Sequence, residues 1–165
     1  MIYIRTLTGK LKEEDREKDY LFYSPSQKHD KIIKAKKITI WDNHTFYWRT
    51  RYLKKDRDEK SKEHYLWYIN FILNNWSEGI IVITPDVEWN KYKEEIEKEW
   101  IKCSHIPQLY VPNTINPSNL NIVGYALRKN STELHPTWNH CLGHIRDIDC
   151  PLLTYDSVIE REINS

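Results

Sequence analysis

Three carboxylates and one histidine come directly after two short apolar runs that are typical of buried strands. Asp42 and His44 follow the first run, and Asp86 and Glu88 follow the second. Carboxylate oxygens suit Mg²⁺ and Mn²⁺, and such an ion would polarise a phosphoryl group and activate a water molecule. These four residues are therefore candidate catalytic residues for metal-dependent phosphodiester hydrolysis. The competing interpretation is structural, with Asp86 capping the following helix and Glu88 interacting with the helix dipole.

A second group of residues has the chemistry of a zinc site. Cys141 and His144 have a spacing that can wrap one ion, and Cys103 and Cys150 could complete a tetrahedral set. Four protein ligands would make this zinc structural. The alternative is that the cysteines are buried and pack as small apolar side chains. An odd number of cysteines, three, argues against a disulfide framework.

A locally basic and aromatic stretch is the candidate nucleic-acid surface. Aromatic rings stack on bases and Lys or Arg side chains hold phosphates, which is the combination that binds single strands. The alternative is a hairpin that buries one aromatic face and leaves a charged face in water. The residues of this surface are Trp48, Arg49, Arg51, Lys54, Lys55 and Arg57.

Composition limits the classes of function. The 165 residues predict a single globular domain, residues 1–165, and 25 basic against 24 acidic side chains leave no global field that would attract nucleic acid or a membrane. No run of about 18 apolar residues is present, so we expect no membrane partner and a cytoplasmic protein. The preference for Ile, Lys and Asn over Val, Arg and Ala suggests a viral, phage or low-GC origin.

The elements that must position these residues follow from periodicity and turn signals. An apolar run bounded by Gly79 and Pro85 lies between two amphipathic helix patterns, as expected for a parallel strand with crossover helices. The prediction comprises strands at 2–7, 19–23, 79–84, 108–111 and 122–127; a charged turn or short helix at 10–18; a hairpin over 38–52; a helix from 58 or 61 to 76; a helix from Asp86 to Trp100; an irregular segment at 132–151; and a short helix at 156–163.

These elements predict an α/β fold, with a mixed α+β arrangement as the alternative. We expect one three-layer domain in which a mixed sheet has central parallel βαβ units and antiparallel hairpin strands at its edge. In such sheets ligands bind beyond the carboxyl ends of the parallel strands. The candidate catalytic residues are placed there by this topology.

The functional prediction is a small accessory protein that acts on nucleic acid, by binding and also by metal-dependent phosphodiester hydrolysis if the carboxylates hold a metal. The alternative is a non-catalytic module that inhibits a host protein by docking through exposed aromatic side chains. Nucleotide or sugar binding is also compatible with the fold, although the four glycines form no phosphate loop. Zinc or Mg²⁺/Mn²⁺ are the candidate cofactors. The sequence determines neither the oligomeric state nor whether the protein is an enzyme.

Overall fold

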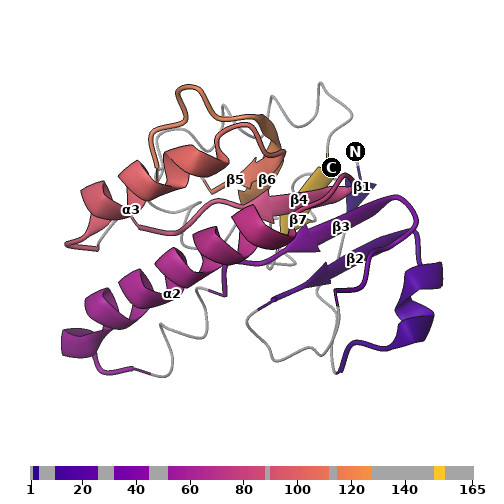
Figure 1. The fold of residues 1–165 in the computed structure, drawn as a ribbon, viewed down its shortest axis with the longest axis horizontal. Helices are drawn as coiled ribbons and strands as arrows, with labels where there is room; N and C mark the ends of the chain where they lie inside the picture. Colours follow the sequence, from indigo (N-terminus) through magenta and orange to yellow (C-terminus); the bar gives the residue numbers. More distant parts are fainter. Residues whose placement is uncertain are drawn as a thin grey trace.

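The computed structural model describes residues 2–3, 10–25, 32–44, 52–87, 90–111, 115–127 and 151–154. Within these ranges a seven-stranded sheet has the order β1-β7-β6-β5-β4-β3-β2, and every neighbouring pair is parallel (Figure 1). The strands are β1 (Ile2–Tyr3), β2 (Tyr20–Tyr23), β3 (Ile38–Trp41), β4 (Ile80–Ile83), β5 (Gln108–Tyr110), β6 (Ile122–Leu127) and β7 (Pro151–Thr154).

Two α-helices connect the central strands. Helix α2 (Lys54–Asn75) leads from β3 to β4, and α3 (Lys93–Trp100) leads from β4 to β5. From β2 to β7 the chain moves one strand at a time in one direction, so crossovers of one hand place both helices on one face. Figure 1 shows α2 and α3 side by side. Two short 3-10 helices, η1 (Glu13–Glu17) and η2 (Ile101–Cys103), complete the described helical elements.

The predicted α/β class with central parallel units is confirmed, but the antiparallel hairpin is wrong. Strand β3 has β2 on one side and β4 on the other, both parallel, with Ile40 opposite Phe22 and Ile81. Neither side of β3 is therefore available for an antiparallel arm. The sheet is not mixed in the part of the chain that the structure describes. A third layer stays a prediction, because both described α-helices lie on the same face.

Strand β7 is the element that sequence periodicity missed, since the segment before it has no regular pattern. The predicted terminal helix at 156–163 lies outside the described residues. The 22-residue length of α2 raises the question of a membrane span, and none of the helices in the described ranges combines the length and apolarity needed to cross a bilayer.

The core lies on both faces of the sheet. Trp41, Tyr68 and Trp100 are fully buried between the strands and the two helices, and the rings of Tyr68 and Trp100 stack 5.9 Å apart. A second apolar cluster that includes Ile40 and Leu109 is fully buried on the opposite face. All four positions of β4 are buried, as expected for a central parallel strand with both faces covered.

The hydroxyl of Tyr68 lies where β3 and β4 separate. It is 3.1 Å from the carbonyl oxygens of Trp41 and Ile83, and it accepts the backbone N–H of Ile83 at 3.2 Å. The last register pair between these strands is Trp41 with Val82, so the hydroxyl takes the place of the next ladder bond. Burial raises the pKa of Tyr68, which keeps the hydroxyl protonated and able to donate.

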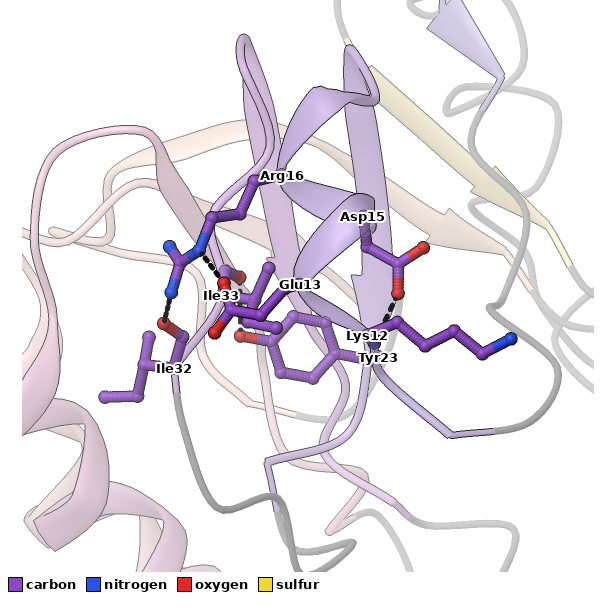
Figure 2. A network of polar contacts seen from close by, with 7 residues as sticks. All are labelled: Lys12, Glu13, Asp15, Arg16, Tyr23, Ile32 and Ile33. Carbon is purple, nitrogen blue, oxygen red and sulfur yellow. Dashed lines mark hydrogen bonds and ion pairs between the residues drawn. The ribbon is translucent and has the colours of Figure 1, made fainter.

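A polar network holds η1 and residues 32–33 beside β2 (Figure 2). The buried carboxylate of Asp15 accepts the backbone N–H of Lys12 at 2.7 Å, which closes the start of η1. Arg16 donates to the carbonyl oxygen of Ile32, and the hydroxyl of Tyr23 donates to that of Ile33 at 2.9 Å. These bonds tie Ile32 to η1 and Ile33 to the carboxyl end of β2.

We expect the substitution Tyr68→Phe to lower the free energy of unfolding by about 1–3 kcal/mol, because it leaves the buried N–H of Ile83 without its acceptor. The matched control is Tyr92→Phe, which removes a hydroxyl that bonds Glu59 near the surface and should cost less than about 0.5 kcal/mol. Urea unfolding of the three proteins measures both effects. Equal stabilities for the two variants would contradict a structural role for the Tyr68 hydroxyl.

Candidate functional site

The candidate site lies at the carboxyl ends of β3 and β4, beneath the N-terminal half of α2. This helix is roughly 33 Å long, whereas four-residue strands span roughly 13 Å. The C-terminal end of α2 is fixed to the start of β4, where the indole N–H of Trp76 donates to the carbonyl oxygen of Ile80 at 2.8 Å. The N-terminal half of α2 therefore extends past the carboxyl edge of the sheet (Figure 1).

Asn43 joins the ends of the two strands. Its side-chain Nδ2 is 2.7 Å from the carbonyl oxygen of Thr84 and 2.6 Å from Oδ1 of Asp86, and the residue is fully buried. Its backbone oxygen accepts a hydrogen bond from Nε2 of His64 at 2.8 Å. One asparagine thus contacts β3, the segment after β4, and α2.

His64 is a neutral, buried member of this group. Because its partner is a carbonyl oxygen, Nε2 carries the proton that donates to Asn43. Burial lowers the pKa of His64 to about 4; the bond to Asn43 opposes this shift, and the nearby His44 adds to it. The ring is therefore uncharged near neutral pH and acts as a hydrogen-bonding group.

His44 lies closer to the surface than His64, with its ring centroid 6.2 Å from that of His64. Its backbone has a φ of 62°, in the left-handed region that non-glycine residues adopt at a cost. Burial lowers the pKa of His44, and the carboxylate of Asp42 opposes that shift.

The structure brings Asp42 and Asp86 to the same edge, as predicted. Asp42 follows β3 directly, and Asp86 is held by Asn43; both are half-buried. The alternative interpretation of Asp86 as a helix cap is wrong, because α3 begins at Lys93 with Tyr92 at the N-cap position. Glu88 lies outside the described residues.

The segment before α3 packs against α2 instead of starting a helix. Asn90 donates to the side-chain oxygen of Ser61 at 2.7 Å and to the carbonyl oxygen of Asp58 at 3.2 Å. The hydroxyl of Tyr65 reaches the carbonyl oxygen of Asp86 at 3.2 Å. These contacts hold Asp86 and Asn90 against the overhanging half of α2, and α3 starts several residues later than the apolar pattern predicted.

An exposed aromatic ring lies next to the polar group. Trp67 stacks on His64 at 5.9 Å and on Phe71 at 5.2 Å, and 42% of the residue remains exposed. Trp41 and Trp100, by contrast, are fully buried. Trp67 therefore presents an aromatic surface that is supported by its neighbours. It is linked to Asn43 through His64, which contacts both residues.

The metal predictions have limited structural support. Among the described residues, no group of three or more His, Cys, Asp or Glu side chains is placed to hold a metal ion. Cys103 is buried in the core, and burial raises the pKa of its thiol to about 12, so it packs as a neutral thiol. Its proposed partners Cys141, His144 and Cys150 lie outside the described residues, and the zinc site stays a prediction.

The predicted basic surface is described only in part. Lys54 and Lys55 are exposed in the first turn of α2, whereas Arg57 is half-buried and donates to the carbonyl oxygen of Tyr52 at 2.9 Å. Arg57 therefore has a structural bond at the start of the helix. The remaining members, Trp48, Arg49 and Arg51, lie outside the described residues.

Sequence reasoning missed three residues of the site: Asn43, His64 and Tyr68. His64 and Tyr68 are four residues apart on the buried face of α2 together with Ile72, so a histidine within an otherwise apolar stripe was the available signal. Asn43 lies in the middle of the predicted hairpin over 38–52, where an asparagine is typical of a turn. No local pattern distinguishes a buried asparagine from a turn asparagine.

No known protein family, curated protein or solved structure matches this chain.

We expect His64 to make stability depend on pH. Above pH about 6.5 the ring is neutral in both states; between about 6.5 and about 4 the unfolded chain binds a proton that the folded protein excludes, so stability falls as the pH falls. At about 1.36 kcal/mol per pH unit, this loss approaches roughly 3 kcal/mol near pH 4.

The test is to compare His64→Gln with the unmodified protein by urea unfolding across this pH range. The variant cannot titrate at this position, so its stability should depend less on pH, and the two curves should converge as the pH falls. Parallel curves would mean that His64 is protonated equally in both states.

Proposed function

We propose that this protein binds a nucleotide unit, either free or within a single nucleic-acid strand, at the carboxyl edge of β3 and β4. The observation that carries the proposal is the group formed there by Asp42, His44, the Asn43–Asp86 pair and the exposed ring of Trp67. This is the edge at which parallel α/β sheets bind their ligands.

The two carboxylates favour a ligand with hydroxyl groups. Carboxylate oxygens accept hydrogen bonds from ribose hydroxyls, and acidic residues after parallel strands do this in dinucleotide-binding folds. Asp42 and Asp86 follow adjacent parallel strands, which places them on neighbouring segments of the edge. A bare phosphate would be repelled by two carboxylates, so a sugar is the better fit for this position.

The base would stack on Trp67. Base–aromatic stacking contributes about 1–3 kcal/mol per base and tolerates different bases. Because His64 and Phe71 already support the indole, little conformational freedom remains to be lost when a base binds.

When the ligand is a strand, the phosphate contacts come from Lys54 and Lys55, which lie about 18 Å along α2 from Trp67 and so meet a neighbouring nucleotide of the strand. Two cations in the first turn oppose the helix dipole, so helix stability does not account for them. Their ammonium groups are exposed at the overhanging end of α2, where a ligand phosphate can reach them.

Phosphodiester hydrolysis would extend this proposal only if Glu88 joins Asp42 and Asp86 on a divalent metal. Structural zinc and a cytoplasmic location likewise remain proposals. A non-catalytic module that docks on a host protein is the second candidate, and it is favoured by the exposure of Trp67, Leu73 and Ile101 at 42%, 44% and 65%.

The test uses two ligands and one substitution. A fluorescently labelled single-stranded oligonucleotide of about 12 residues tests strand binding by anisotropy, and AMP tests binding of a free nucleotide by calorimetry. We expect Trp67→Leu to weaken binding by about tenfold, since it removes the stacking surface. The matched control, Leu73→Ala, changes an exposed side chain of the same helix and should leave the affinity within about twofold.

Binding of the oligonucleotide but not of AMP would identify a strand as the ligand, and the reverse would identify a free nucleotide. If neither ligand binds the unmodified protein, nucleotide binding is wrong and the protein-docking candidate takes its place.

We expect strand binding to depend on salt through the two lysines. Replacing Lys54 and Lys55 together with Gln should reduce the slope of log K against log salt by about 1.4 for a single strand, because two counterions are no longer released. The control is the same double substitution at Lys36 and Lys37, which are exposed before β3. An unchanged slope at Lys54 and Lys55 would exclude their contact with phosphate.

A further inference from the structure

The side-chain amide of Asn43 uses both of its hydrogens on acceptors that belong to the segment after β4. One acceptor is the carbonyl oxygen of Thr84 at 2.7 Å, and the other is Oδ1 of Asp86 at 2.6 Å. Both neighbours only accept when the carboxylate is ionised, so the nitrogen and not the oxygen of the amide must face them. The orientation of Asn43 is thereby fixed by its surroundings.

Burial makes these bonds obligatory. Asn43 is fully buried, and an amide taken out of water without partners costs several kcal/mol, so each hydrogen must be used. The bond to Asp86 is also charge-assisted, which makes it one of the stronger types of hydrogen bond. Movement of the Asp86 carboxylate away from Asn43 would break this bond and leave a buried N–H group without an acceptor.

The main chain of Asn43 adds a third connection. Its carbonyl oxygen accepts the Nε2–H of His64 on α2, which fixes the tautomer of that histidine. Asn43 therefore links the end of β3, the segment after β4 and the overhanging helix. Among the candidate ligand-binding side chains, Asp86 accepts a hydrogen bond from the Asn43 amide.

We infer that Asn43 is a positioning residue that orients the Asp86 carboxylate before a ligand arrives. Asn43 is fully buried, so it acts on the ligand through Asp86 and not by contact. The inference rests on the proposed function for its effect on binding, while the locked geometry can be measured in the ligand-free protein. A carboxylate held in place loses little freedom on binding, which is how preorganisation improves affinity.

The first measurement is hydrogen exchange of the Asn43 side-chain amide by NMR, in the unmodified, ligand-free protein. We expect both amide protons to exchange at least about 100-fold more slowly than those of Asn70, which is exposed on α2. Exchange as fast as that of Asn70 would overturn the inference, whatever the protein binds.

The second measurement compares Asn43→Asp and Asn43→Ala with the exposed control Asn70→Asp, using the oligonucleotide and AMP. In Asn43→Asp two carboxyl groups would lie at hydrogen-bond distance, where the charge of one raises the pKa of the other, so that both are ionised only at the higher pH. We expect this variant to bind about tenfold more weakly than the unmodified protein at pH 8, with the deficit shrinking to about threefold at pH 5.5 as the pair takes up a proton.

Asn43→Ala should bind about tenfold more weakly at both pH values, because it has no group to protonate. A purely structural role would lower stability without this pH-dependent recovery, and affinity within about twofold in both folded variants would overturn the inference. If the unmodified protein binds neither ligand, the proposed function fails, and amide exchange alone decides whether Asn43 locks Asp86.

Discussion

The separation of β3 from β4 at their carboxyl ends is the constraint on which the rest of this structure depends. Parallel strands that part leave backbone N–H and C=O groups without ladder partners inside a buried region, and each such group is costly unless a side chain replaces the missing bond. The Tyr68 hydroxyl does this for Trp41 and Ile83. Just beyond β4, the Asn43 amide bonds the carbonyl oxygen of Thr84. Strand separation and the polar character of the edge are thus two aspects of one feature.

This arrangement explains why the polar residues of the edge come from α2 as well as from the strands. His64, Tyr65 and Tyr68 occupy little more than one helical turn, and each bonds a backbone oxygen at the end of β3 or β4, or just beyond it. The rings of the same side chains are buried in the core. Each residue therefore contributes apolar packing through its ring and a hydrogen bond through its polar atom. Any ligand at this edge would meet a surface whose geometry is set by the packing of α2, with stability and binding sharing the same residues.

The position of α3 depends on contacts with α2. The residues after β4 bond to the overhanging half of α2, and Lys62 forms an ion pair with Glu95 at 3.0 Å between the two helices. Trp100, at the end of α3, stacks on Tyr68 of α2 and donates its indole N–H to the buried side chain of Gln108 in β5 at 2.9 Å. The polar group at the carboxyl edge and the apolar layer beneath it are continuous through Tyr68.

Most central elements could be predicted from the sequence, because their signals are local. The run from Ile80 to Ile83 between turn residues determined a buried strand, and recurring apolar residues at three- and four-residue steps determined that a helix lies on each side of it. The helix starts differ from the prediction, since α2 begins earlier, at Lys54, and α3 later, at Lys93. The positions of Asp42 and Asp86 after strands determined that they would share an edge. Only the tertiary structure decided which strands pair: β3 lies between two parallel neighbours, and this excluded the hairpin that local alternation favoured. It also decided that Asp86 bonds Asn43 instead of capping a helix, and that Asn43 and His64 belong to the site, because burial and hydrogen-bond partners arise from packing between residues distant in the chain.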